Sequence, residues 1–473
     1  MNASEVLETI ARDKIEFVDL KFTDLPGSWH HVTLPARELD ASSFTAGLPF
    51  DGSSLRGFRE IEESDMILMP DPQSAFIDPF HSHATLSLVA DVLDPALRPY
   101  SRDPRGVAKR AEAFLQASGI ADRAYFGPEL EFFVFDDVRF DNSPHASFFS
   151  LDGEESQWSS GDASSRPGYR IRAKEGYAPV PPLDALSDLR SEMVLHLEAI
   201  GIRVERHHHE VATAGQSEIG FAYDTLVKTA DNVLAFKYVV KNTAVENGRS
   251  ATFMPKPLFG DNGSGMHTHQ SLWKGKTPLF FDDRGYGQMS DTALFYIGGI
   301  LRHAPALVGL CNASTNSFRR LVPGYEAPTD LVFAKGNRSA AVRIPISAVS
   351  AKSSRIEFRT PDSTGNPYLA FAAMLMAGLD GIRNQIDPRK LGMGPLDKNI
   401  YHLSARDRKK IRSVPGSLAE ALAELKRDHA FLLHGGVFSA DLIEAWIDYK
   451  MSHEVHPVGL RPTPYEFQLY YDI

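Results

Sequence analysis

Apolar and polar side chains alternate along the first hundred residues with the two-residue period of β-strands. The clearest alternation covers residues 15–22, and the turn sequence Leu25-Pro26-Gly27-Ser28 leads into a second strand-like run at residues 29–34. A third run covers residues 85–92. This pattern predicts a small β-rich domain at the start of the chain.

Prolines at positions 95, 99 and 104 then interrupt the alternation, and we expect the boundary between two domains there, with residues 1–103 on one side and 104–473 on the other. The pattern beyond the boundary mixes helices and strands. Asp103 and Pro104 have the composition of a helix start, Gly119 that of a helix end, and a strand is predicted over residues 125–135.

The order of helix followed by strand recurs, with a helix predicted over residues 187–201 and a strand over residues 203–211. Ser417 and Glu420 form a capping-box pattern before residues 418–433, and Gly435-Gly436 ends that predicted helix. The polar stretch Asn142–Arg166 is predicted to be a surface loop. These elements together predict an α+β catalytic domain.

Composition narrows the class of protein. A chain of 473 residues with 43% hydrophobic and 23% charged residues is expected to be globular and to contain at least two domains. Its net charge of −11 argues against a nucleic-acid partner. A single cysteine, no basic-then-apolar start and no apolar run near about 20 residues predict a cytoplasmic protein with no disulfide and no membrane partner.

Two glutamates lie two residues apart in the apolar run Gly127–Phe133, so a strand would direct Glu129 and Glu131 to the same face. Paired carboxylates in a buried strand are costly unless a metal or cations compensate them. A solvated strand face is the alternative, but the phenylalanines around this pair disfavour it. Glu210 and Glu218 form a second acidic pair, after three histidines, His207 to His209, that we interpret mostly as packing or hydrogen-bonding groups.

Two further segments add candidate ligands. A glycine-rich loop, Gly260–Gly265, precedes His267 and His269, which would share one strand face, and Arg355–Arg359 would present Arg, Glu and Arg on one face. A solvated edge strand has the same pattern as the latter. Many glutamates with one histidine suit Mg²⁺ or Mn²⁺, and two such ions beside a phosphate are typical of phosphoryl transfer.

Positive charge is concentrated in residues 319–359, which carry an excess of five positive charges in an otherwise acidic chain. Arginine binds carboxylates and phosphates through two parallel hydrogen bonds, so this window predicts small anionic ligands. The loop Leu321–Pro328 has the Gly and Pro content of a flap that screens a reactive intermediate from water.

Several long motifs resemble those of bacterial type I glutamine synthetases. They occur in order along the chain: FDGSS at Phe50–Ser54, then GPELEFF, HHHEVATAGQ, TFMPKPLFGDNGSGMH, RLVPGYEAP, GNRSA and RIEFR, with PYEFQLYY near the carboxyl end. The resemblance implies a β-grasp-like N-terminal domain, a catalytic domain with a curved antiparallel sheet, and a homo-oligomer, a double-ringed dodecamer with active sites between subunits.

The resemblance also implies two to three Mg²⁺ or Mn²⁺ ions per site, with L-glutamate, ATP and ammonium as substrates. It assigns one ion to Glu131, Glu210 and Glu218, and a second to Glu129, His267 and Glu357. It assigns glutamate to Asn262, Gly263, Arg320, Glu326, Arg338 and Arg359. It assigns the phosphates and nucleotide of ATP to Arg338, Arg343, Arg355, Lys352, Ser271, His269, Tyr223 and Glu205.

The expected chemistry has two steps, in which the γ-carboxylate of glutamate attacks the γ-phosphate of ATP and ammonia then displaces phosphate. The resemblance implies that Asp51 of an adjacent subunit takes a proton from ammonium, in a cation site lined by Ser53, Tyr177, Glu210 and Glu326. Asp51, Glu326 and Arg338 are the expected catalytic residues, with Glu326 closing a flap over the intermediate.

Two positions depart from the family pattern. Tyr401 lies in a loop that resembles the adenylylation loop of a regulated subgroup, which implies an adenylyltransferase partner, but His402 follows it where an acidic residue is usual. The alternative is an ordinary exposed tyrosine. Ala351-Lys352 replaces the usual Pro-Lys without removing the lysine.

Two other functions stay open at this point. A glutamate ligase for another amine would share the metals and arginines but would not need the ammonium site around Asp51. A non-catalytic relative would have lost a metal carboxylate or a phosphate-side arginine, and the sequence has lost neither.

Overall fold

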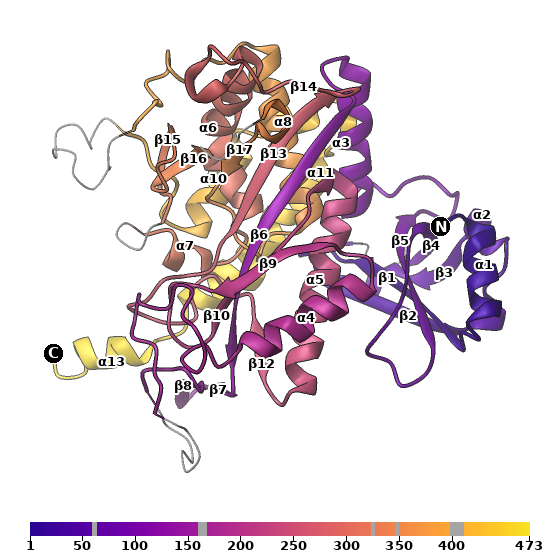
Figure 1. The fold of residues 1–473 in the computed structure, drawn as a ribbon, viewed down its shortest axis with the longest axis horizontal. Coiled ribbons are helices and arrows are strands. Elements are labelled where there is room, and N and C mark those ends of the chain that lie inside the picture. The colour runs from indigo at the N-terminus through magenta and orange to yellow at the C-terminus, as the bar shows by residue number, and fades with distance from the viewer. Residues whose placement is uncertain (59–63, 159–167, 323–326, 346–349, 398–410) are drawn as a thin grey trace.

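The computed structural model describes residues 1–58, 64–158, 168–322, 327–345, 350–397 and 411–473. It has two parts, a small N-terminal domain and a large domain built around a long, curved sheet (Figure 1). The fold is of the predicted α+β class.

The small domain holds one five-stranded sheet with the order β2-β1-β5-β4-β3. Strands β1 and β5 are parallel and the other neighbours are antiparallel. Its elements are α1 (Ala3–Arg12), β1 (Phe17–Thr23), β2 (Trp29–Pro35), α2 (Ser43–Ala46), β3 (Leu48–Asp51), η2 (Gly52–Ser54), β4 (Asp65–Ile77) and β5 (Thr85–Leu93). The three predicted strands are confirmed, and their apolar side chains form a core of their own.

The large domain has a sheet with the order β15-β16-β17-β13-β6-β10-β9, in which β15 and β16 are parallel and the other neighbouring pairs of described strands are antiparallel. Its strands are β6 (Arg123–Phe135), β9 (Val204–His209), β10 (Gln216–Phe221), β11 (Asp224–Thr225), β12 (Ser250–Thr252), β13 (Met266–Lys274), β14 (Thr277–Pro278), β15 (Asp330–Lys335), β16 (Ala340–Ile344) and β17 (Ile356–Phe358). Strands β6 and β13 run side by side through its centre (Figure 1).

Helices cover this sheet. They are α3 (Pro104–Ser118), α4 (Ser187–Ala199), α5 (Leu226–Glu246), α6 (Asp291–Cys311), α7 (Ser317–Arg320), α8 (Pro367–Arg383), α10 (Leu418–Arg427), α11 (Ala440–Lys450), α12 (His456–Gly459) and α13 (Pro464–Tyr470). Helix α3 begins and ends as predicted, because the Asp103 carboxylate accepts hydrogen bonds from Arg105 N and Gly106 N, and Gly119 adopts a left-handed φ of 70°.

Helix α6 is the one described helix with the length and hydropathy of a membrane span, at 21 residues and a mean hydropathy of 1.4. However, 89% of its apolar window is buried inside the protein. It packs closely on α8, where a Cβ at Gly299 would lie 2.0 Å from the carbonyl oxygen of Ala377. Its apolar composition therefore serves the core of the large domain.

Two predictions about the large domain are wrong in part. The polar stretch predicted as a loop contributes to a hairpin of β7 (Asp137–Ser143) and β8 (Ala146–Asp152), because Phe140 pairs with Phe149 across the two strands. The helix predicted over residues 418–433 ends at Arg427, after which a 3₁₀ segment covers Ala430–Gly436. Ser417 caps α10, but the Glu420 carboxylate accepts a hydrogen bond from Gly416 N, so the reciprocal bond to Ser417 N is replaced.

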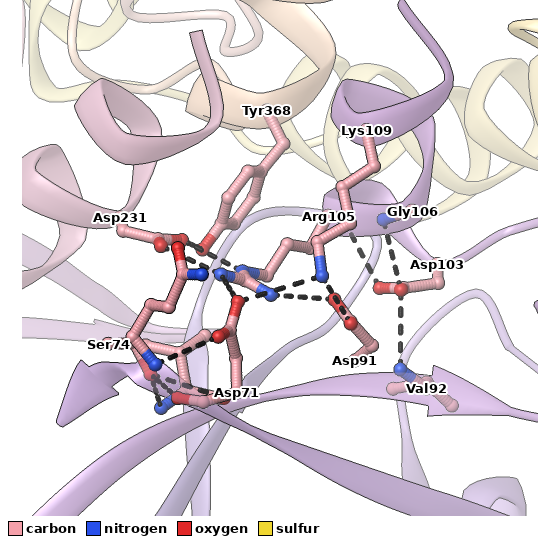
Figure 2. A network of polar contacts seen from close by, with 12 residues as sticks. Asp71, Ser74, Asp91, Val92, Asp103, Arg105, Gly106, Lys109, Asp231 and Tyr368 are labelled. Carbon is pink, nitrogen blue, oxygen red and sulfur yellow. Dashed lines mark hydrogen bonds and ion pairs between the residues drawn. The ribbon is translucent and has the colours of Figure 1, made fainter. Parts of the chain in front are cut away.

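A buried ionic network joins the two domains (Figure 2). Arg105 of α3 donates to Asp71 of β4 at 2.7 Å and to Asp91 of β5 at 2.7 Å, both in the small domain. It also donates to Asp231 of α5 at 3.0 and 2.9 Å, and the Tyr368 hydroxyl donates to the same aspartate at 2.6 Å. One guanidinium therefore compensates three carboxylates from both sides of the domain interface.

We expect Arg105→Leu to lower the free energy of unfolding by about 3–5 kcal/mol, because it leaves three partly or fully buried carboxylates without their shared cation. Chemical denaturation monitored by circular dichroism would measure this change. Arg98→Leu is the matched control: it also removes an Arg–Asp pair, but the Arg98 side chain is 78% exposed against 4% for Arg105. A similar loss in both variants would contradict the role given to Arg105.

Candidate active site

The register of three antiparallel strands brings one set of acidic residues together. Glu218 of β10 lies opposite Glu131 of β6 on one side and opposite His208 of β9 on the other. Glu210 follows β9 directly. His208, Glu210 and Glu218 offer ligand atoms that all lie within 4.8 Å of one another.

A second set forms on the other side of β6. His267 of β13 lies opposite Glu129 of β6, and His269 of β13 lies opposite Glu357 of β17. The Glu129 carboxylate is 3.6 Å from His267 Nδ1 and 3.0 Å from His269 Nε2. Glu357 lies 3.9 Å from His267, and Glu129, His269 and Glu357 form a second group with ligand atoms within 4.8 Å.

The structure thus brings five of the six sequence-predicted metal ligands onto neighbouring strands and places the sixth, Glu210, directly after β9. It also adds His208, one of the three consecutive histidines that were interpreted mostly as packing or hydrogen-bonding groups. His209 fits that interpretation, because it is fully buried and bonds to Glu155 at 3.0 Å. The signal that distinguishes His208 is its cross-strand pairing with Glu218, which the sequence alone does not contain.

Charge repulsion and burial disturb the protonation of the first set. Burial, reinforced by the neighbouring Glu210 carboxylate, raises the pKa of Glu131 to about 7. Burial and the Glu218 carboxylate raise the pKa of Glu210 to about 7 as well. Burial also raises the pKa of Glu218, although a hydrogen bond with His208 opposes the change. These three carboxyl groups lack sufficient positive charge around them, and a divalent cation would supply it.

The second set is compensated by arginines. Glu357 is fully buried, yet Arg359 and the nearby histidines overcome the effect of burial and lower the pKa of Glu357 to about 2. Arg359 and Arg343 both donate to this carboxylate, the latter at 2.5 Å. For His267, burial and the charge of Arg359 lower the pKa to about 4, so its imidazole is neutral and can act as a metal ligand.

Arg320 and the glycine-rich loop lie beside the carboxylates. Arg320 is buried at the end of α7 and donates to the carbonyl oxygens of Thr360 at 2.8 Å and Arg359 at 3.2 Å. A Cβ at Gly265 would lie 2.5 Å from Arg320 Nη2, and Gly265 N donates to the Glu131 carboxylate at 2.5 Å. The loop with Asn262 and Gly263 therefore needs glycine here to approach the arginine this closely.

A pocket of about 320 Å³ opens next to the second set. Six of the eight residues predicted to contact ATP line it, namely Glu205, Tyr223, His269, Ser271, Lys352 and Arg355, and Arg338 and Arg343 do not. Arg355 Nε donates to His269 Nδ1 at 3.3 Å, and Arg355 Nη1 donates to the carbonyl oxygen of Ser353 at 3.0 Å. Arg206, Tyr125 and Trp273 also line the pocket and were not among the predicted site residues.

The remaining predicted residues are dispersed. Tyr177 stacks edge-on against His208 with ring centroids 5.5 Å apart, and Arg338 lies close enough to lower the proton affinity of Glu210. Asp51 accepts hydrogen bonds from Ser53 N at 2.9 Å and Ser53 Oγ at 2.7 Å, and these bonds lower the pKa of Asp51. Asp51 and Ser53 both belong to the small domain. Glu326 and Tyr401 lie outside the described residues.

Two sets of oxygen-rich ligands beside arginines and a pocket are suited to divalent metals and to anionic substrates such as phosphates and carboxylates. The fold and this site together define a class of protein: a two-domain enzyme with a metal-binding catalytic sheet.

The comparisons with known proteins identify the family. Residues 14–95 match the family described as glutamine synthetase, beta-Grasp domain, and residues 101–470 match glutamine synthetase, catalytic domain. The chain belongs to the glutamine synthetase family.

Full-length relatives agree with this result. The chain is 55% identical to a glutamine synthetase of Frankia alni and 53% identical to one of Streptomyces coelicolor, in each case over 100% of this chain and 99% of the relative. Among solved structures, the Plasmodium falciparum glutamine synthetase is similar with a TM-score of 0.90 at 29% identity, covering 100% of this chain and 99% of that one.

The protonation of Glu131 and Glu210 leads to a prediction about metal binding. A bound cation must displace protons from these groups, so we expect Mn²⁺ affinity to rise as pH increases through about 7 and to level off above about pH 8. Isothermal titration calorimetry at pH 6, 7 and 8, in buffers of different ionisation enthalpy, would measure affinity and proton release.

Glu131→Gln should weaken Mn²⁺ binding and reduce the number of protons released. Glu198→Gln, at an exposed position of α4, is the control and should change neither quantity. Binding of the same strength from pH 6 to pH 8, with no proton release, would contradict this assignment.

Proposed function

We propose that the chain joins ammonia to the γ-carboxylate of L-glutamate at the expense of ATP, giving glutamine, ADP and phosphate. Family membership over the full length of the chain supports this activity. The observation that carries it at the level of residues is the adjacency of the carboxylate–histidine sets to the 320 Å³ pocket, with Glu129 and His269 belonging to both.

Two divalent ions, Mg²⁺ or Mn²⁺, are proposed, one for each set. A third ion would bring the total to the upper end of the two to three ions per site that the family resemblance implies. Glu131, Glu210 and Glu218 would hold one ion, with His208 beside them, and Glu129, His267 and Glu357 would hold the other. Bound there, the ions would polarise the transferring phosphate and neutralise the charge that develops on it.

The pocket is proposed to hold ATP, with Glu205, Tyr223, His269, Ser271, Lys352 and Arg355 around it. Arg343, which donates to Glu357 at 2.5 Å, is proposed to contact the phosphates from outside the pocket lining. A solved neighbour that is 31% identical to this chain, with a TM-score of 0.80, is titled a GmaS/ADP complex, which supports a nucleotide site in this fold. Glutamate is proposed to bind between Arg320, Arg338 and Arg359 and the loop at Asn262 and Gly263, with Glu326 closing over it.

The proposed reaction has two steps. A γ-carboxylate oxygen of glutamate attacks the γ-phosphorus of ATP, the bond to the β-phosphate oxygen breaks, and an acyl phosphate and ADP form. Ammonia then attacks the acyl carbon, the phosphate leaves with the bonding electrons, and a proton is lost from nitrogen. Arg338, Arg343 and Arg355 would stabilise the phosphate, and Glu326 would accept the proton.

Asp51 is proposed to deprotonate ammonium in a site formed with Ser53, Tyr177, Glu210 and Glu326. Strand β3, which ends at Asp51, is the outer edge strand of the small sheet and lies away from β6 and β10 (Figure 1). Because β3 lies away from those strands, the Asp51 that deprotonates ammonium is proposed to come from a neighbouring subunit. This arrangement supports active sites shared between subunits.

A homo-oligomer, a dodecamer, is also proposed. Helix α13 extends away from the large domain at the carboxyl end and has exposed aromatic side chains, including Tyr465, Phe467 and Tyr471 (Figure 1). Exposed apolar surface of this kind is typical of protein interfaces, and we propose a second copy of the chain as its partner.

Three further assignments are proposals on the same basis. Separate hydrophobic cores on either side support domains at residues 1–103 and 104–473. A cytoplasmic location is supported by a single, buried cysteine. Adenylylation of Tyr401 by an adenylyltransferase rests on the sequence resemblance alone.

The activity can be tested by phosphate release from ATP and glutamate with ammonium, hydroxylamine and several alkyl amines. We expect turnover with ammonium, and a preferential loss of that reaction in Asp51→Ala, because the variant lacks the base that deprotonates ammonium. Turnover with an alkyl amine but none with ammonium would contradict the proposal, and an equal loss with every amine would contradict the role of Asp51.

Sharing of the site can be tested with mixed oligomers. Asp51→Ala and Glu357→Ala should each be nearly inactive, because the first lacks the base and the second lacks a metal ligand. When the two variants are dissociated and reassembled together, some sites combine an intact Asp51 with an intact Glu357. We expect those mixtures to recover activity, up to about one quarter of wild type on random assortment. Mixtures as inactive as either parent would argue for a site within one subunit.

A further inference from the structure

Asp261 is a buried carboxylate to which the proposed catalytic steps assign no role. It directly precedes the proposed glutamate-binding residues Asn262 and Gly263, and only 2% of its surface is exposed. A buried carboxylate is costly unless hydrogen bonds satisfy it, so its partners indicate what it is for.

Those partners are backbone groups of three separate segments. Oδ1 accepts from Asn262 N at 2.9 Å and from Lys174 N at 3.0 Å, and Oδ2 accepts from Thr213 N at 2.9 Å. Each segment carries a residue of the proposed site close by: Gly263 in the loop, Tyr177 after Lys174, and Glu210 before Thr213. One carboxylate therefore holds these three segments at a fixed separation.

A fourth segment is attached through the backbone of the same residue. Lys256 Nζ donates to the carbonyl oxygen of Asp261, and Lys256 N donates to Asn316 Oδ1 at 2.7 Å. Asn316 precedes α7, whose last residue is Arg320. The position of the loop is thus linked to the arginine proposed to bind the glutamate carboxylate.

Neighbouring contacts reinforce the same arrangement. Gln216 donates to the Gly263 carbonyl at 3.1 Å and accepts from Ala212 N at 2.8 Å. Gly176 N donates to the Val211 carbonyl at 2.9 Å, and a Cβ at Gly176 would lie 2.6 Å from the Glu210 carbonyl. The segments of Tyr177 and Glu210 are therefore in direct contact and would move together if Asp261 released them.

We propose that Asp261 is a positioning residue that sets the glutamate site and the ammonium site relative to one another. The proposal rests on the proposed function, because it uses the roles assigned to Asn262, Tyr177, Glu210 and Arg320. The nucleotide pocket lies outside its reach, since none of the residues that line the pocket bonds to Asp261 in the described part of the chain.

The test compares Asp261→Asn and Asp261→Ala with wild type in steady-state kinetics. The asparagine variant keeps the shape but directs an N–H₂ group at one set of backbone donors, and the alanine variant removes both acceptors. We expect the KM for glutamate and the KM for ammonium to rise together by about tenfold in Asp261→Asn and further in Asp261→Ala. The KM for ATP should stay within about twofold of wild type.

Asp380→Asn is the matched control. Asp380 is also a buried aspartate that accepts hydrogen bonds, from His303 at 3.0 Å and Asn384 at 2.9 Å, but it lies on α8 outside the proposed site. We expect this variant to lose thermal stability without any change in the three KM values. If the Asp261 variants behave in the same way, Asp261 has only a general structural role.

Amide hydrogen exchange provides a measurement that needs no activity. Asp261→Asn should increase exchange in residues 171–178, 211–215 and 260–264 at once, and Asp380→Asn should not. Faster exchange in residues 260–264 alone would overturn the inference. If wild type releases no phosphate with any amine while all three segments respond, Asp261 still holds the three segments together but the proposed function fails.

Discussion

The arrangement of five glutamate side chains, four on neighbouring strands and one directly after β9, is the physical constraint around which the large domain is organised. Glu129, Glu131, Glu210, Glu218 and Glu357 are all buried or partly buried in one region of the sheet. Such a concentration of negative charge would destabilise a protein unless cations balanced it. Arg343 and Arg359 balance Glu357 from within the chain, while the raised pKa values of Glu131 and Glu210 indicate a deficit that a metal ion would remove.

Four of the five glutamates lie on strands, and Glu210 directly follows β9. Cross-strand hydrogen bonds between β9, β10, β6, β13 and β17 fix the separation of side chains that repel one another. The glycine-rich loop and α7 then bring Arg320 against the same region, and Asp261 ties that loop to two neighbouring segments. Helices α6 and α8, which are almost wholly buried, support the arrangement from within the core.

At the domain interface, too, buried charged side chains are balanced by partners of opposite charge. Asp19 and Lys21 lie on the same face of β1, and both side chains are buried. Lys21 pairs with Asp19 at 2.5 Å and lies over the ring of Tyr238 at 4.6 Å, on α5 of the large domain. Together with the Arg105 network, this contact means that the polar face of the small sheet serves as an interface and not as a solvent-exposed surface.

The sequence by itself determined the class of fold, the first strands, the limits of α3 and the two acidic pairs, because these depend on local periodicity and on capping. The ordered motifs determined the family. Only the tertiary structure decided that His208 faces Glu218, that Asp103 and Arg105 lie at a domain interface, and that Asp261 joins three segments. Those contacts depend on strand register and on segments far apart in the chain, and neither is encoded in local spacing.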